Sequence, residues 1–115
     1  MNTDHDCIFC KIVAGRIPAK KVHEDAELLV FHDIHPWAPV HVLVVPKVHI
    51  GSLAEVGAEH EAMLGRLLGL APRLMRQLGV ENGFRTVINT GRDGGQEVQH
   101  LHVHVLGGPR PWLKG

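Results

Sequence analysis

One run constrains this chain more than any other: residues 100–108 alternate three histidines with apolar side chains and end in two glycines. Side chains on a strand point alternately to opposite faces. His100, His102 and His104 therefore share one face, and the apolar residues between them share the other. Same-face positions lie roughly 6.5–7 Å apart along a strand, so two neighbouring imidazoles converge on one ion or phosphate more easily than three. We therefore expect the three histidines to have different roles.

A glycine-rich segment, residues 89–99, leads into this strand. Glycine leaves backbone N–H groups open to an anion without side-chain hindrance, which suits a phosphate. The three histidines alone leave a structural role, metal binding and catalysis open. The loop and the strand together favour a phosphate site.

The size and charge of the chain limit the classes of protein to consider. Its 115 residues suit one domain with a modest core, and we expect a single domain over 1–115. The formal charge is zero and acidic and basic residues are mixed, which argues against disorder and against nucleic-acid binding and favours a small ligand. No apolar run approaches the ~20 residues of a membrane span and no leader pattern begins the chain, so we expect no membrane association and a cytoplasmic location.

Strands and helices follow from the apolar pattern. Apolar residues recur at three- and four-residue intervals over residues 59–78, which predicts an amphipathic helix with a kink at Pro72. Shorter helical turns are predicted over residues 7–14 and from Ser52. Strands are predicted at residues 21–23, 26–31, 41–45, 83–89 and 100–108. Together these elements predict an α+β fold: an antiparallel sheet of about five strands, one long helix and a short N-terminal helix, with the helices on one side of the sheet.

The only two cysteines, Cys7 and Cys10, form a Cys-x-x-Cys pair. In a reducing compartment this spacing favours metal or redox chemistry over a structural disulfide. A tetrahedral zinc site needs two further ligands, for which the chain has ten histidines. Two cysteines alone also allow two reduced, unligated thiols.

The segment 93–96, Asp-Gly-Gly-Gln, followed by the His-x-His-x-His pattern and Leu-Gly-Gly, resembles the histidine triad (HIT) superfamily, closest to its nucleotide-binding branch of nucleoside phosphoramidases. The resemblance covers almost the whole chain. The other matching segments, in the family's order and spacing, are residues 31–34, 38–41, 45–47 and 49–50. The resemblance implies a HIT-like fold.

The same resemblance implies a catalytic group of His41, His100, His102 and His104. His102 would be the nucleophile, which also suits its central position among the three histidines, because a neutral imidazole is available near its ordinary pKa of about 6.5. His104 would contact the phosphate or the leaving group. His41 would support the strand that carries the other three.

Substrate contacts are implied in the same way. Asp33 would accept hydrogen bonds from the ribose hydroxyls, although an aspartate here is equally well explained as a turn residue. Glu97 stands where some family members carry serine, a departure that leaves open how the leaving group is protonated. The remaining implied contacts are Phe9 and Ile34 to the base, Asn89, Gly95 and the backbone N–H groups of Glu97 and Val98 to the phosphate, and Trp112.

The implied reaction is hydrolysis or transfer at the α-phosphate of a purine nucleoside phosphoramidate, through a covalent nucleotidyl-histidine, with release of AMP or GMP and without a catalytic metal. Two alternatives stay open: a regulatory nucleotide-binding module with vestigial catalysis, and a metalloenzyme that uses His102 and His104 as ligands. The resemblance also implies a structural zinc held by Cys7, Cys10, His49 and His100. It implies a homodimer in which the tail with Trp112 lies at the partner's site.

Overall fold

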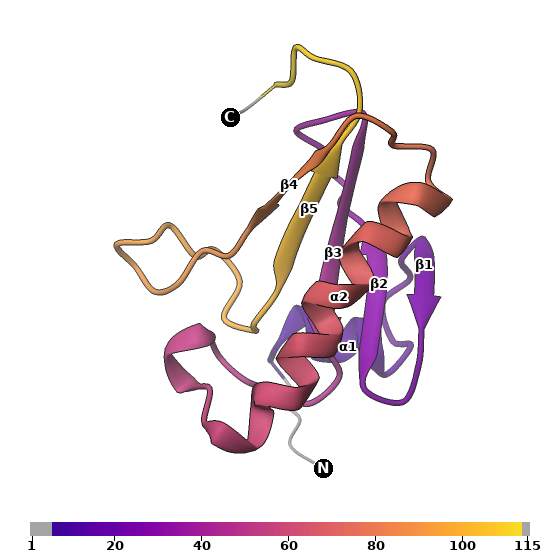
Figure 1. The fold of residues 1–115 in the computed structure, drawn as a ribbon. Coiled ribbons are helices and arrows are strands. Elements are labelled where there is room, and N and C mark those ends of the chain that lie inside the picture. The colour runs from indigo at the N-terminus through magenta and orange to yellow at the C-terminus, as the bar shows by residue number, and fades with distance from the viewer. Residues whose placement is uncertain (1–5, 114–115) are drawn as a thin grey trace.

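The computed structural model describes residues 6–113, which build a five-stranded antiparallel sheet with helices packed against it (Figure 1). The strand order across the sheet is β1-β2-β3-β5-β4. The strands are β1 Lys21–Glu24, β2 Leu28–His32, β3 Val40–Pro46, β4 Phe84–Val87 and β5 Val103–Gly107. The helices are α1 Ile8–Val13 and α2 Glu61–Gln77, with 3₁₀ turns η1 Leu53–Glu55 and η2 Ala58–His60 between β3 and α2. The predicted α+β class, the hairpin and the long helix between the third and fourth strands are confirmed.

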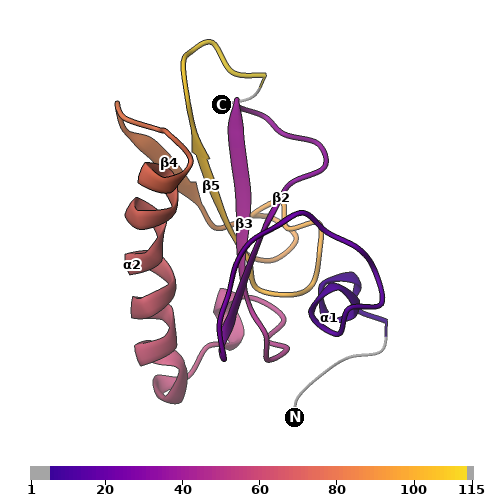
Figure 2. The ribbon, with the colours of Figure 1, turned by 90° about the vertical axis from the view of Figure 1, so that its right-hand side faces the viewer.

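The two helices lie on opposite faces of the sheet, so the expectation that both lie on one side is wrong (Figure 2). Leu28 and Val30 of β2 face a core shared with α2, whereas Leu29 and Phe31 face a second core shared with α1. A strand covered on both faces needs apolar residues at successive positions, not alternate ones. The unbroken apolar run in β2 is the sequence feature that indicated a sheet covered on both faces.

Helix α2 begins after η2 and includes Pro72 within a single helix, and the kink expected at Pro72 stays a prediction. Proline lacks the backbone N–H, but the helix continues for five residues beyond it to Gln77. Gly79 then takes a positive φ of 83°, a conformation that glycine adopts without strain. Among residues 6–113, no helix is both long enough and apolar enough to cross a bilayer.

Strand β5 begins at Val103, later than the predicted start at residue 100. The N–H of Leu101 donates to the carbonyl of Ile50 at 2.7 Å, so this part of the chain is tied to the loop after β3 and not to a neighbouring strand. The two-faced pattern is nevertheless confirmed. Leu101 and Val103 lie in the core under α2, while the ring of His102 lies against Phe9 of α1 on the other face.

Candidate functional site

A cavity of about 450 Å³ opens on the face of the sheet that carries α1. Apolar residues from α1, β2 and β3 supply part of its lining, including Ile8, Phe9, Ile12, Phe31 and Leu43. The glycine-rich loop and the histidine segment supply polar residues, including Asn89, Gly95, Glu97, His102 and His104. Asp33, Ile34 and Val98 also line it, so the structure brings together every predicted substrate contact except Trp112.

The ring of His102 is oriented by a main-chain carbonyl. Its Nδ1 lies 2.7 Å from the carbonyl oxygen of His100, and because a carbonyl only accepts, Nδ1 carries the proton. The neutral ring then has its lone pair on Nε2. Phe9 holds the ring in place by an edge-on contact with centroids 5.1 Å apart. A buried imidazole with a lone pair at a cavity wall is suited to attack an electrophile.

His41 and His104 form a directed pair of imidazoles. The N–H of Trp37 donates to Nδ1 of His41 at 3.0 Å, so the His41 proton is on Nε2. That Nε2 lies 2.9 Å from Nδ1 of His104, which therefore accepts and leaves the His104 proton on Nε2. The strand register makes this pairing possible, because Leu43 of β3 stands opposite His104 and His41 is two residues away on the same face.

Burial keeps this pair neutral. It lowers the pKa of His104 from its ordinary 6.5 to about 4, with smaller contributions from the neighbouring His102 and His41. It also lowers the pKa of His41, against which the charge of Asp33 acts. His104 is thus a neutral donor at physiological pH.

Asp33 sits at the end of β2, and both readings of it from the sequence fit the structure. Its Oδ1 accepts from the N–H of His35 at 2.8 Å, the turn contact expected of an aspartate in a loop. Its Oδ2 lies 3.5 Å from Nε2 of His41. The carboxylate also lines the cavity, where it can accept from a ligand hydroxyl.

The glycine-rich loop is held by Gln96, a buried residue that was not among the predicted site residues. Its Oε1 accepts from the N–H of Gly91 at 2.9 Å, and its Nε2 donates to the carbonyl of Gly51 at 2.7 Å. Gly95 has a positive φ of 78°, and a Cβ on Gly94 would collide with the backbone of Thr90. The loop conformation therefore requires both glycines.

Three aromatic residues near Asp33 line the cavity and were also missed: His32, His35 and Trp37. The indole of Trp37 stacks on His104 at 5.0 Å between centroids and 16° between planes. The signal that could have found these residues was their position beside Asp33.

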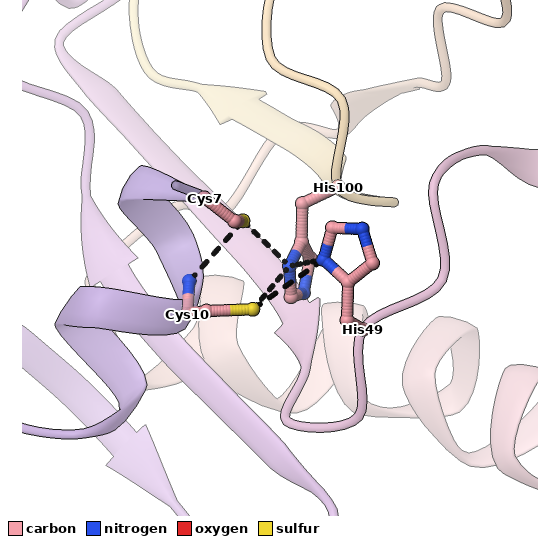
Figure 3. A group of neighbouring side chains, drawn as sticks. All are labelled: Cys7, Cys10, His49 and His100. Atoms are coloured by element: carbon pink, nitrogen blue, oxygen red, sulfur yellow. Dashed lines mark hydrogen bonds between the residues drawn. The ribbon is translucent and has the colours of Figure 1, made fainter. Parts of the chain in front are cut away.

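A second group of side chains, the thiol–histidine cluster, consists of Cys7, Cys10, His49 and His100, which point toward one another (Figure 3). Their ligand atoms all lie within 4.8 Å of one another. Nδ1 of His100 is 3.2 Å from Sγ of Cys7 and 3.5 Å from Sγ of Cys10. Nδ1 of His49 is 3.4 Å from Sγ of Cys10 and 3.3 Å from Nδ1 of His100.

These separations suit a tetrahedral metal. Sulfur and nitrogen ligands around zinc stand roughly 3.3–3.8 Å from one another when the bonds are about 2.3 and 2.0 Å long. Nε2 of His100 donates to the carbonyl of Pro46 at 2.8 Å, which leaves the Nδ1 lone pair directed into the cluster. The donor set and its geometry therefore fit zinc.

Asp33, His41 and His104 form a third close group, the relay cluster, whose ligand atoms also lie within 4.8 Å of one another. A neutral histidine that binds a metal through Nε2 carries its proton on Nδ1. In His41 that proton would point at the N–H of Trp37, which already donates to Nδ1. The relay cluster therefore fits a hydrogen-bond relay and not a metal.

Trp112 lies outside the cavity of its own chain. Its Nε1 donates to the carbonyl of Gly108 at 3.0 Å, and the guanidinium groups of Arg110 and Arg85 lie 3.8 and 5.4 Å from its ring centroid. The indole is half-buried by these contacts. A single chain thus does not bring Trp112 to this cavity, and its predicted place at a partner's site stays a prediction.

A family model described as the HIT domain matches residues 14–110. The chain belongs to the histidine triad family. Protein HitA of Neisseria gonorrhoeae is 51% identical over 104 residues, which cover 90% of this chain and 97% of HitA. The purine nucleoside phosphoramidase of Escherichia coli K12 is 44% identical over 104 residues, covering 90% of this chain and 87% of that enzyme.

Solved structures of the family have the same fold. A histidine triad protein from Clostridium difficile, 43% identical, superposes with a TM-score of 0.89 over 94% of this chain and 95% of its own. A zinc-bound histidine triad protein from Mycobacterium smegmatis, 35% identical, superposes with a TM-score of 0.78 over 89% of this chain and 74% of its own. The predicted family membership and HIT-like fold are confirmed.

Proposed function

We propose that this protein is a nucleotide hydrolase of the HIT type that cleaves the P–N bond of purine nucleoside phosphoramidates. The observation that carries the proposal is that two histidines of complementary chemistry line the same cavity. Nε2 of His102 carries a lone pair, and Nε2 of His104 carries a proton. A nucleophile beside a neutral donor suits attack on a phosphoryl group. The resemblance of this chain to a purine nucleoside phosphoramidase supports the choice of bond.

The reaction has two steps. Nε2 of His102 attacks the α-phosphorus, a P–N⁺ bond to the imidazole forms, and the bond to the amine breaks with its electron pair leaving on nitrogen. The amine takes a proton from solvent at the open side of the cavity. Water then attacks the same phosphorus and loses a proton to solvent, the bond to His102 breaks with its electron pair returning to Nε2, and AMP or GMP is released. His104 donates a hydrogen bond to a phosphoryl oxygen in both steps.

The apolar part of the cavity suits the base. Ile34 is 86% exposed and Ile8 is 46% exposed at the cavity, although both are large apolar residues. A purine between them and Phe9 would remove this apolar surface from water. Asp33 would then accept from the ribose hydroxyls, and Asn89 with the N–H groups around Gly95, Glu97 and Val98 would hold the phosphate.

The charge of the cavity limits the leaving group. Among the lining residues of the described chain, histidines aside, only Asp33 and Glu97 carry a formal charge, and none is lysine or arginine. Two carboxylates without a cation disfavour a polyphosphate and tolerate a phosphate with a single negative charge. Exposed Glu97 further favours a neutral or cationic amine over an anionic leaving group.

The thiol–histidine cluster is proposed to hold a structural zinc through Cys7, Cys10, His49 and His100. Zinc at this position would join α1 to the loop after β3 and to the start of the histidine segment. The main-chain oxygen of His100 also accepts from Nδ1 of His102. By fixing His100, the ion would also restrict the motion of His102, the proposed nucleophile. No step of the proposed reaction uses the metal.

Three further properties are part of the proposal. The protein acts as a homodimer, with the tail around Trp112 at the partner's site. It is cytoplasmic, and one domain spans residues 1–115. Sedimentation at micromolar concentration tests the first of these, and a monomer with full activity would remove the role of the tail.

The assay that tests the function is release of AMP from adenosine phosphoramidate by the purified protein, with and without a chelator. Turnover that survives chelation supports the proposal and argues against a metalloenzyme that uses His102 and His104 as ligands. AMP binding without turnover would instead indicate a regulatory nucleotide-binding module.

A further inference from the structure

Trp37 makes two separate contacts with the relay cluster. Its indole lies nearly parallel to the ring of His104, with centroids 5.0 Å and planes 16° apart, and it lies tilted on His41 at 5.0 Å. An offset parallel stack restricts rotation of the smaller ring about its side-chain bonds. The stacked indole therefore covers one face of the His104 ring, and both residues line the cavity. The ring plane of His104 is therefore set by Trp37 as well as by β5.

The main chain of Trp37 supplies the second contact. Its N–H donates to Nδ1 of His41, and this bond decides where both imidazole protons of the relay cluster lie. If that N–H moved away, His41 could carry its proton on Nδ1 and accept from His104, and Nε2 of His104 would no longer be a donor. One main-chain group thus sets the polarity of a chain of hydrogen bonds that ends at the cavity.

The peptide that carries this N–H is itself held. The N–H of Leu113 donates to the carbonyl of Trp37 at 2.7 Å, so the residue's carbonyl is occupied as well as its N–H. Trp37 lies between Pro36 and the buried Ala38, in the connection between β2 and β3. A loop residue with its N–H, its carbonyl and its ring all engaged is a fixed part of the site.

We propose that Trp37 is a positioning residue: its indole sets the ring plane of His104 and its N–H sets the proton of His41, so that His104 presents Nε2–H to the cavity. The inference rests on the proposed function, because it assigns His104 the role of a neutral donor to the phosphoryl group. A merely structural tryptophan would fill space without governing the imidazole protons. The two roles make different predictions for His104.

The groups that face His104 define what happens when the stack is removed. They are His41, His102, Asp33 and Trp37, of which only Asp33 is charged while the imidazoles are neutral. Trp37→Leu keeps the main-chain N–H but removes the ring. His104 then gains solvent, so its pKa moves up from about 4 toward 6.5.

The first experiment is ¹⁵N NMR of the imidazoles in the wild-type protein and in Trp37→Leu and Trp37→Phe. In the wild type we expect His104 as the Nε2–H tautomer. In Trp37→Leu we expect its pKa to rise by a measurable amount, and in Trp37→Phe to stay close to the wild-type value because an aromatic ring is kept. A wild-type His104 with its proton on Nδ1, or an unchanged pKa in Trp37→Leu, overturns the proposal.

The second experiment separates kcat from binding. Trp37→Leu should lower kcat for adenosine phosphoramidate roughly 10- to 100-fold, since a displaced donor acts mainly in the transition state, while the Kd of AMP changes less than about threefold. Phe84→Leu, an aromatic-to-leucine change on exposed β4 outside the cavity, is the matched control and should leave kcat unchanged. Equal losses in kcat and AMP binding would assign Trp37 to substrate binding and overturn the positioning role. A wild type without turnover would overturn the proposed function alone, because the NMR measurement needs no activity.

Discussion

The thiol–histidine cluster and the relay cluster both use histidine, but the imidazole offers a lone pair in the first and an N–H in the second. In the thiol–histidine cluster a main-chain carbonyl, that of Pro46, accepts the Nε2 proton of His100 and leaves a lone pair directed at two thiols. In the relay cluster a main-chain N–H, that of Trp37, donates to Nδ1 of His41 and leaves a proton directed at His104. A carbonyl thus prepares a metal ligand and an N–H prepares a hydrogen-bond donor.

His102 lies between the two clusters and depends on both. Its Nδ1 donates to the main chain of His100, while its ring contacts that of His104 at 5.0 Å between centroids. The difference between the clusters shows that the main-chain partner of a histidine, and not its presence in a motif, decides what its other nitrogen can do. The first three predictions below each alter one cluster or the residue between them, and the fourth alters a charge at the cavity that His102 and His104 line.

The largest expected effect is that of His102→Ala on turnover. Without the nucleophile, kcat for adenosine phosphoramidate should fall by several orders of magnitude, while AMP affinity changes little because Asp33 and the glycine-rich loop are untouched. Rapid quenching of the wild type with labelled substrate should trap an acid-labile nucleotidyl adduct on the peptide that contains His102. An adduct on another residue would overturn the assignment.

The next effect concerns metal and stability. His49→Ala should remove zinc from protein purified without chelator and lower the midpoint of thermal unfolding by roughly 10 °C, because a ligand at 1,000 times its Kd stabilises by about 4 kcal/mol. His60→Ala, a half-buried histidine outside the cluster, is the matched control and should keep one equivalent of zinc. Less than about a tenth of an equivalent in the wild type would remove the proposed site.

The relay cluster predicts a loss of stability in acid. The folded pKa of His104 is about 4 and its ordinary value is 6.5, so between these values the unfolded chain binds a proton that the folded chain excludes. Stability is therefore fully present above about pH 6.5 and falls as the pH drops toward 4, and the lowered pKa of His41 acts in the same direction. Urea unfolding at pH 7, 6 and 5 with chelator present measures this fall. In His104→Gln the fall should be shallower, and an equal fall would contradict the assignment.

The smallest expected effect is that of Glu97→Gln. Glu97 is exposed, so removal of its charge should change kcat/KM by only a few-fold, in favour of substrates with a carboxylated amine and against those with a cationic amine. The ratio of kcat/KM for two such substrates, measured at low and at high salt, tests the charge effect. Asp93→Asn, an exposed acidic residue outside the lining, is the control. A salt-independent ratio would contradict an electrostatic role.

Local chain geometry was enough to predict several features. Alternation on an extended chain placed His100, His102 and His104 on one face even though β5 starts only at Val103, because side-chain direction follows from backbone torsion. The amphipathic period predicted the helix found at Glu61–Gln77. The glycines of the loop were expected only to leave N–H groups open to a phosphate, and the structure adds that positive φ or close backbone approach requires glycine there. The resemblance to the family supplied the membership of the thiol–histidine cluster, which residue types alone left open.

Tertiary structure decided what depends on contacts between distant segments. The sequence determined the local structure and the side chains available for the site, since turns, the amphipathic helical period and side-chain chemistry depend only on residues close together in the chain. Only the fold decided that α1 lies opposite α2, that the register of β3 and β5 brings His41 to His104, and that the carbonyl of Pro46 meets the ring of His100. The hydrogen bond between His41 and His104 joins residues 63 positions apart, and hydrogen bonds of such separation form only when distant strands pair.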